Sequence, residues 1–483
     1  MTTYYVNSAT GSNSNGGTSA DTPFATFSAV EALKLQPGDT VLLAAGSVFN
    51  EQFDIKYSGT VSAPITIGSY GVGDAPVIHS PGDGIHSLYA SNIVIENIKI
   101  SDTEGAAIYG GTVSNWTVRN VEIDHTGLSR SGSVTFRTGS NLTIENTTIN
   151  DVNGDGMWIE KINGVTLVNN TVTNAHGTAA DAIQINDSSN IFISGNTLDQ
   201  TGASTPKGVL TLIRPVNAVI EDNVLTGGGF GISAQAGTNI TIHDNDISGY
   251  GGYSWSYGIG LGDSGDTRDY DIAGNYIHDG VWGVSVSSAG TTSYVRENID
   301  VHNNTFDDLT QAALKVDRPA SGAFHDNAIA SDVTPYSISP AIIAAGTFPV
   351  SNNTTFEDTE FRVASLNAQV SGETVHVTAD LTTTGHDNQK DKIALDKAGH
   401  ANFLDDSVFG ETLQLRHFGH DVFDRHEPTP KGGDHGAAVD FADLFADKGG
   451  LGESHHLEIA DAASHHGEAD AAGTPGHPDG LLH

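Results

Sequence analysis

The sequence predicts an all-β fold, a right-handed parallel β-helix of about 11 or more coils. A helical cap is expected at its N-terminal end and an acidic, largely irregular tail at its C-terminal end. Three observations predict this fold. They are a Gly-rich composition, an Asn-centred phrase that recurs once per expected coil, and short apolar alternations between the recurrences.

The composition suits short strands and tight turns better than packed helices. The 483 residues include 57 Gly and no Cys, and 37% are hydrophobic. Without Cys there is no thiolate metal site, so a metal would need oxygen or imidazole ligands. The formal net charge of -38 would repel nucleic acids and anionic membranes. No apolar run approaches the roughly 20 residues of a membrane span.

The recurring phrase places an Asn between two apolar alternations, as in Ile95-Glu96-Asn97-Ile98. Successive Asn lie 22 to 30 residues apart, which is one coil of a three-sided β-helix. Stacked Asn side chains are expected to form a hydrogen-bonded ladder along the axis. The Asn positions are 97, 120, 146, 170, 196, 223, 245, 275, 304, 327 and 353.

The chain divides into three regions. Residues 1–80 are expected to form the N-terminal cap and first coils, with a helix between Thr26 and Leu35 over the end of the coil. Residues 81–356 form the catalytic or binding β-helix. Residues 357–483 hold 24 Asp+Glu against 8 Lys+Arg and 13 of the 21 His, so we expect an acidic, His-rich tail with one short strand pair near Glu373–Val377.

The first region resembles the N-terminal end of bacterial β-helix polysaccharide lyases, including pectate lyases of the calcium-and-lysine type. The resemblance implies a secreted protein that acts on a carbohydrate. The matching stretches are Tyr4-Tyr5-Val6-Asn7, Gly16-Gly17-Thr18, Pro23-Phe24-Ala25-Thr26, Pro37-Gly38-Asp39-Thr40-Val41, Gly59-Thr60 and Ala63-Pro64-Ile65-Thr66-Ile67.

The candidate catalytic residues are Asp155, Asp181, Lys207 and Glu160. The first three precede predicted strands and are separated by 26 and 26 residues, so they should stand on successive coils about 4.8 Å apart. The alternative role for an Asp in this place is to bond only the turn backbone. The expected substrate contacts are Arg137, Trp158, Gln184, Arg214, His176, Tyr253 and Trp255.

Two chemistries fit these residues. A lyase that cleaves an exopolysaccharide by β-elimination is preferred, with Ca²⁺ held by Asp155, Asp181 and Glu160 while Lys207 takes the proton. Asp155, Asp181 and Lys207 resemble the carboxylates and Lys of the calcium-and-lysine pectate lyases. The alternative is a glycoside hydrolase that uses a pair of the same three carboxylates. A uronate C5-epimerase and a non-catalytic glycan-binding adhesin are further alternatives.

The two ends of the chain bear on localisation. Met1–Tyr5 enters a strand without the apolar core of a signal peptide. The stretches Asp405–Gly410 and Asp443–Gly450 resemble the tails of type I secretion substrates. We therefore expect an extracellular protein exported by a route that needs no signal peptide.

Overall fold

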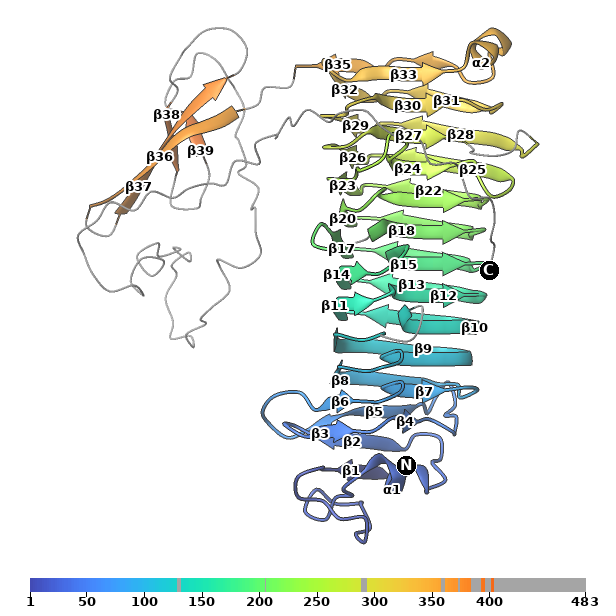
Figure 1. Cartoon of the computed structure of the whole chain (residues 1–483), viewed down its shortest axis with the longest axis vertical. Coiled ribbons are helices and arrows are strands. Elements are labelled where there is room, and N and C mark those ends of the chain that lie inside the picture. The colour runs from blue at the N-terminus through green and yellow to red at the C-terminus, as the bar shows by residue number, and fades with distance from the viewer. Residues whose placement is uncertain are drawn as a thin grey trace, which may run out of the picture. The chain divides into compact units, whose positions relative to one another are not determined.

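The computed structural model describes residues 1–127, 132–204, 206–287 and 293–357, and the backbone of four strands between residues 361 and 403. It confirms the parallel β-helix, whose strands stack over about 12 turns (Figure 1). The described chain divides into two units, Met1–Asp358 and Thr359–His483.

Each coil contributes strands to three parallel sheets, called faces A, B and C in chain order. Face A contains β4 (Phe53–Asp54), β7 (Ile85–Ser87), the beginnings of β9 (Ile108–Asp124) and β10 (Gly132–Glu145), β12 (Asp155–Glu160), β15 (Ala180–Asn186), β18 (Pro206–Ile213), β21 (Ile232–Gln235), β24 (Tyr257–Leu261), β27 (Trp282–Val286), β30 (Ala312–Val316) and β33 (Thr334–Ile338).

Face B contains β1 (Thr3–Val6), β2 (Thr40–Ala44), β5 (Ile65–Tyr70), the first part of β8 (Ile93–Ser101), the middle of β9, the end of β10, β13 (Ile162–Val168), β16 (Ser189–Ser194), β19 (Val216–Glu221), β22 (Thr238–His243), β25 (Thr267–Ala273), β28 (Arg296–His302), β31 (Gly322–His325) and β34 (Val350–Ser351).

Face C contains β3 (Val48–Asn50), β6 (Val77–His79), the ends of β8 and β9, β11 (Thr148–Asn153), β14 (Thr171–His176), β17 (Thr197–Gln200), β20 (Val224–Gly227), β23 (Asp246–Ser248), β26 (Tyr276–Ile277), β29 (Thr305–Phe306), β32 (Ala328–Ala330) and β35 (Thr354–Phe356).

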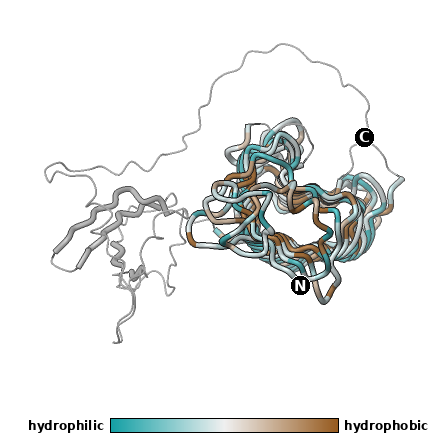
Figure 2. The backbone as a smooth tube through the Cα atoms, turned by 90° about the horizontal axis from the view of Figure 1, so that it is seen from below, coloured by the Kyte–Doolittle hydropathy of each residue, from teal (hydrophilic) through white to brown (hydrophobic). Residues whose placement is uncertain are grey.

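The core is built from the alternate residues that point inward on every strand. In β15, Ile183 stacks on Met157 of the preceding coil and on Leu210 of the following coil, and all three are fully buried. Figure 2 looks along the solenoid and shows hydrophobic positions recurring in the same places from coil to coil. The repeated burial of apolar side chains is the main force that holds such a stack together.

The predicted Asn ladder is present from Asn170 to Asn353. Asn223 Nδ2, for example, donates to Asn245 Oδ1 at 2.9 Å and to the carbonyls of Ile193 and Glu221 at 3.0 and 2.8 Å. Its Oδ1 accepts hydrogen bonds from the main-chain and side-chain nitrogens of Asn196, both at 2.9 Å. Each buried amide is thereby satisfied by its neighbours along the axis.

The first three Asn of the predicted series lie outside this buried ladder. Asn97, Asn120 and Asn146 occupy left-handed turn positions with φ of 56°, 51° and 48°. The ladder position in the last of these coils belongs to the next residue, Thr147, whose amide donates to Asn170 Oδ1 at 3.1 Å. Asn is common both at the left-handed turn position and at the buried ladder position after it, because its short amide tolerates left-handed backbone and also bonds nearby main chain. The sequence pattern therefore does not distinguish these two adjacent positions.

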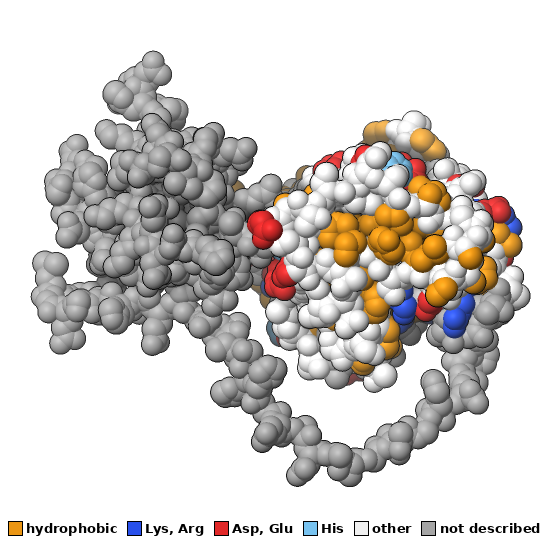
Figure 3. Space-filling view, turned by 90° about the horizontal axis from the view of Figure 1, so that it is seen from above, with side chains coloured by type: hydrophobic (Ala, Val, Ile, Leu, Met, Phe, Trp, Pro, Cys, Tyr) orange, Lys and Arg blue, Asp and Glu red, His pale blue; other side chains and the backbone are white. Residues whose placement is uncertain are grey.

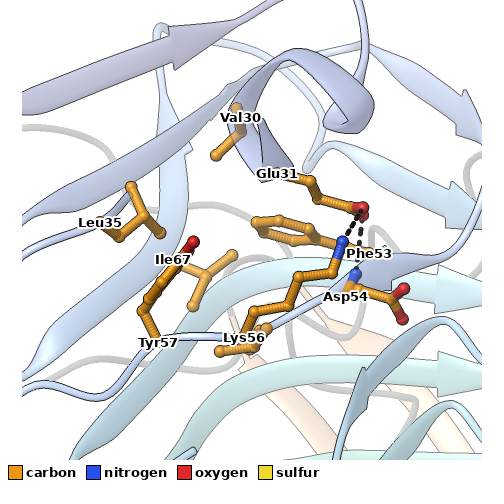
Figure 4. Close-up of a pocket in the computed structure, with 9 residues that line it drawn as sticks. Val30, Glu31, Leu35, Phe53, Asp54, Lys56, Tyr57 and Ile67 are labelled. Carbon is orange, nitrogen blue, oxygen red and sulfur yellow. Dashed lines mark hydrogen bonds and ion pairs between the residues drawn. The ribbon is translucent and has the colours of Figure 1, made fainter. Parts of the chain in front are cut away.

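A helix stands at the N-terminal end of the described coils. The helix α1 spans Phe27–Glu31 and is shorter than the predicted Thr26–Leu35 segment. Phe27 stacks on Phe49 and Phe53 with ring centroids 4.5 and 4.7 Å apart. Figure 4 shows the small cavity beside the helix, of about 10 Å³, where Glu31 bonds Lys56 at 3.0 Å. It has room for about one water molecule, so we assign it a packing role.

The other end of the coil carries the second helix, α2 (Pro340–Ala345), after strand β33. Figure 3 views this end and shows hydrophobic side chains gathered over the last coil. Tyr336 and Ile343 are 43% and 57% exposed.

Several His side chains lie between carboxylates on face C and at the turns. His278 lies 2.9 Å from Asp246 and 2.5 Å from Asp279, and Tyr276 stacks on its ring at 4.0 Å. Burial alone would lower the pKa of His278, but the two Asp raise it to about 9. This His is therefore a cation that ties adjacent coils together at neutral pH.

The second unit has a four-stranded antiparallel sheet, formed by β36 (Phe361–Ser371), β37 (Thr374–Thr383), β38 (Lys392–Leu395) and β39 (Ala401–Phe403). The predicted strand near Glu373–Val377 is part of its first hairpin. The expectations about Asp405–Gly410, Asp443–Gly450 and the secretion-like tail fall outside the described residues. None of the described helices is long and apolar enough to cross a membrane.

Candidate active site

Two buried carboxyl groups on adjacent coils form the centre of the candidate site. Asp155 begins β12 and Asp181 lies near the start of β15, and they are 4% and 0% exposed. The main-chain amide of Asp181 donates to Asp155 Oδ1 at 2.8 Å. The predicted convergence of these two residues is therefore present in the structure.

Such an amide bond alone is a structural feature of strand starts in this fold. Asp83, on an earlier coil of face A, is equally buried, and its Oδ1 accepts from the amide of Ala106 at 2.9 Å. Asp155 differs from Asp83 because its bonding partner on the next coil is itself an Asp. The pairing of two carboxyl groups, rather than the backbone bond, marks the site.

Lys207 completes the predicted trio at a break in the strand register. In the pairing of β15 with β18, Ala180 faces Pro206 whereas Asp181 faces Gly208, so Lys207 is an extra residue. Such a β-bulge re-aims the side chain that it carries and is frequent beside active sites. The Lys207 Nζ atom lies 3.7 Å from Asp181 Oδ2, and the Lys207 side chain is 40% exposed.

The electrostatics of the pair favour protonation of at least one of the two carboxyl groups. Burial and the charge of Asp181 raise the pKa of Asp155 to about 8, although the amide bond and Lys207 oppose this shift. Burial also raises the pKa of Asp181, while Lys207 and the neighbouring Thr211 and Gly208 act in the opposite direction. Two close carboxyl groups in a dry environment cannot both carry a negative charge cheaply.

Several buried polar atoms on these coils of face A have no hydrogen bond of normal geometry among the described residues. They are both carboxylate oxygens of Asp181, Thr211 Oγ1 and Trp158 Nε1. Thr211 and Trp158 belong to the same column of face A, where Gln184 stands between them. Unpaired buried polar groups are costly and rare, so these atoms are candidate partners for bound water or for a ligand.

An aromatic cluster lies on the coils that follow the pair. Phe230 and Tyr257 stack with centroids 5.2 Å apart, and Tyr253 stacks on Trp255 at 4.7 Å. Tyr257 donates to Ser233 Oγ at 3.2 Å. Burial raises the pKa of Tyr257 to about 12, and the charge of Asp181 adds to this rise. The strand register places Phe230 and Tyr257 on the second and third coils after Asp181.

Glycine at position 208 permits this arrangement. A Cβ atom there would lie 2.1 Å from Phe230 Cε2, so any side chain would displace the ring. Phe230, Tyr257 and Thr211 were not predicted as site residues. The signal for Phe230 and Tyr257 was the column that begins with Asp155 and Asp181 and continues, coil by coil, through Gly208. The signal for Thr211 was its place one coil after Gln184.

Glu160, Arg137 and Trp158 do not join the pair. Glu160 lies five residues along β12 from Asp155, roughly 16 Å by the rise of a strand. Its carboxylate bonds Lys161 and, at 3.1 Å, Arg137, and these bonds lower the pKa of Glu160, Lys161 most strongly. The Arg137 guanidinium also lies 5.5 Å from the centre of the Trp158 ring. Glu160, Arg137 and Trp158 thus form a second cluster at the other end of the strand.

Arg214 and His176 are also held by other carboxylates. Arg214 binds Asp187 with its Nε and Nη2 atoms at 2.5 and 2.9 Å, at a turn. His176 Nε2 lies 2.8 Å from Asp151, at the end of β14 on face C. The sequence predicts that Arg214 and His176 lie near the carboxyl pair, but each forms an ion pair with another Asp instead.

The predicted calcium ligands do not form one donor set. Ca²⁺ takes six to eight oxygen ligands. Asp155 and Asp181 are accompanied by the ammonium group of Lys207, whereas Glu160 lies at the far end of β12. Within the described part of the chain, no three His, Asp or Glu residues are arranged to hold a metal ion. The residues present do not fit the Ca²⁺ site that the resemblance implied.

Comparison with known families agrees with this architecture. The model of the right handed beta helix region family matches residues 68–197 and 175–354. The chain belongs to this family. The matched residues of this β-helix protein include the carboxyl pair and the aromatic cluster.

Individual relatives cover the chain unevenly. A lacto-N-biosidase of Bifidobacterium longum subsp. longum is 42% identical over 131 residues, which span 25% of this chain and only 8% of that protein. A solved structure of GH136 lacto-N-biosidase from Eubacterium ramulus is 15% identical, with a TM-score of 0.45 over 74% of this chain and 68% of that one. An alginate lyase from Paenibacillus sp. is 18% identical, with a TM-score of 0.34 over 69% and 98%.

Proposed function

We propose that this β-helix protein is a glycoside hydrolase that cleaves a glycan on face A. The observation that carries the proposal is the pair of buried carboxyl groups, Asp155 and Asp181, on adjacent coils beside unpaired polar atoms. Hydrolysis of a glycosidic bond needs one carboxylic acid and one carboxylate in reach of the same bond.

The two residues differ enough to divide these roles. Asp155 is the general acid, because a pKa of about 8 keeps its proton at neutral pH. Asp181 lies 3.7 Å from the Lys207 ammonium, so it is the member that carries the negative charge. Its side chain is fully buried and must become accessible before it can attack the anomeric carbon. Lys207 is a positioning residue that stabilises this charge.

Hydrolysis is preferred over β-elimination because a lyase must neutralise a uronate carboxylate. The two Arg that could grip it, Arg137 and Arg214, are bound to Glu160 and Asp187. The partial relative named lacto-N-biosidase supports the same choice. Elimination with Lys207 as the base is the second candidate, since the β-bulge aims this side chain at the pair.

The test is incubation of the full chain with neutral and uronate-containing glycans, followed by assays of new reducing ends and of the ultraviolet absorbance of unsaturated products. We expect reducing ends without absorbance, and their loss in Asp155→Asn and Asp181→Asn. Asp83→Asn is the matched control, because it changes an equally buried strand-start carboxylate outside the pair. A rise in absorbance would refute hydrolysis in favour of elimination.

A further inference from the structure

The loop between β23 and β24 presents two aromatic side chains to solvent on a fixed support. Tyr253 and Trp255 are 52% and 48% exposed. The loop is held at its start by Tyr250, which is buried and donates to the carbonyl of Trp282 at 2.9 Å. Trp282 Nε1 in turn donates to the Ser254 carbonyl at 3.0 Å, so the loop is anchored before the exposed pair and between its two members.

The exposed rings form a flat double layer. Tyr253 and Trp255 are nearly parallel, with an angle of 11° between the ring planes. Phe230 and Tyr257 support Trp255 from the side, each with its ring centroid 6.3 Å from it. Rings that are already ordered lose little conformational entropy when a ligand binds. Exposed apolar surface that gathers in one place is typical of ligand-binding sites.

The platform, defined as Tyr253 and Trp255, is continuous with the carboxyl pair. A Cβ atom at Gly229 would lie 2.6 Å from the Lys207 carbonyl and 3.2 Å from Tyr253 Cε2, so the Tyr253 ring passes close to the strand that carries Lys207. The platform stands on the coils that follow Asp181. A chain molecule bound along face A would therefore reach both places.

The charges of face A select against an anionic ligand. The strands of this face carry three described cations, and each pairs with a carboxylate: Arg137 with Glu160 at 3.1 Å, Lys207 with Asp181 at 3.7 Å and Lys315 with Asp317 at 3.4 Å. The chain as a whole has a formal net charge of -38. An unpaired uronate or sulfate would meet repulsion rather than a counter-ion.

We infer that the platform is a subsite for an uncharged pyranose ring of an oligosaccharide whose scissile bond lies at the Asp155–Asp181 pair. The inference rests on the proposed hydrolase function. The C–H face of a sugar ring is slightly positive and apolar, and it complements the negative face of an aromatic ring. The substrate is thereby a neutral glycan long enough to extend from the pair across the following coils to Trp255.

The test separates binding from cleavage. Calorimetric titration of the full-length Asp181→Asn variant with neutral oligosaccharides of increasing length, and with alginate oligosaccharides of matched length, measures affinity without turnover. We expect neutral chains to bind more tightly once they reach the platform. Adding Trp255→Ala should weaken their binding about 10-fold, whereas Trp255→Phe, which keeps a ring, should weaken it less. Tyr89→Ala, which removes a 76% exposed ring elsewhere, is the control.

The outcomes separate three claims: the subsite, the substrate class and the hydrolase function. Equal affinity of the Trp255→Ala and parent proteins for every neutral oligosaccharide would overturn the subsite, provided that thermal melting shows both folded. Tighter binding of alginate than of neutral chains would overturn the substrate class. Platform-dependent binding by a wild-type chain that cleaves none of these glycans would support the subsite and refute the hydrolase.

Discussion

Replacing Asp155 by Asn should make the protein more stable and inactive at the same time. Asn keeps an Oδ1 atom that can accept the amide bond of Asp181, 2.8 Å long in the wild type. It removes both the acidic proton and the need to bury a charge. Active-site groups are frequently maintained at the expense of stability, and this residue offers a direct measure of that conflict.

The magnitude follows from the pKa of Asp155. The native state holds it at about 8, against 3.8 for an unperturbed Asp, so the native state keeps a proton that the unfolded chain releases. The contribution of this proton to the free energy of unfolding is complete below pH 4 and is lost as the pH rises toward 8. Each pH unit between the two pKa values lowers the free energy of unfolding by about 1.36 kcal/mol. Over the roughly three units from the unfolded pKa to pH 7, the wild type loses about 4 kcal/mol that the variant retains.

Urea unfolding followed by circular dichroism at pH 4.5 and pH 7 measures this difference. We expect Asp155→Asn to gain stability over the wild type at pH 7 and little at pH 4.5, and to lose at least about 100-fold in hydrolytic rate. Asp83→Asn should keep activity. A variant whose advantage is the same at both pH values would show that Asp155 is already ionised in the native state and would refute the reasoning.

Four further predictions follow from the same contacts. Lys207→Met should move the acidic limb of the pH–rate profile to higher pH, because Lys207 lowers the pKa of Asp181; loss of activity at every pH would instead support elimination. Adjacent coils about 4.8 Å apart suit the carboxyl spacing of retaining hydrolases, about 5 to 5.5 Å, so NMR of the first product should show a retained anomer. His278→Gln should lower the free energy of unfolding by about 1–2 kcal/mol at pH 6 and by less above pH 9, as measured by thermal melts. The reason is that the raised pKa of His278 stabilises the fold below pH 6.5, and this stabilisation is lost as the pH rises through about 9. Asn223→Ala should lower the free energy of unfolding in urea by about 3 kcal/mol, since it leaves buried carbonyls unpaired. The control Asn217→Ala, in the exposed Asn series, should lower it by about 1 kcal/mol.

The fold could be predicted from the sequence because each coil repeats the same local pattern. Asn phrases and apolar alternations report the turn and the inward residues of a strand, both of which are local properties. The merging of Asn97, Asn120 and Asn146 with the true ladder shows the limit of this method. Two adjacent positions of the turn accept the same residue type, and only three-dimensional placement separates them.

The site was predictable only where coil spacing was regular. Asp155 and Asp181 are 26 residues apart and lie in register on adjacent coils, whereas Lys207 lies beside Asp181 as the extra residue of the β-bulge. Phe230 and Tyr257 were missed because they follow the bulge and coils of unequal length, which shift the count. Glu160 was grouped with the pair because it is near in sequence, yet a strand carries it roughly 16 Å away.

The most direct test of hydrolysis at the Asp155–Asp181 pair is mass spectrometry of the products formed from a defined neutral oligosaccharide in heavy-oxygen water. Hydrolysis predicts two products whose combined mass equals the substrate plus one water, with the heavy oxygen on the new reducing end, and no such products from Asp181→Asn. Unlabelled products whose combined mass equals that of the substrate, or labelled products from the variant at the wild-type rate, would contradict the assignment.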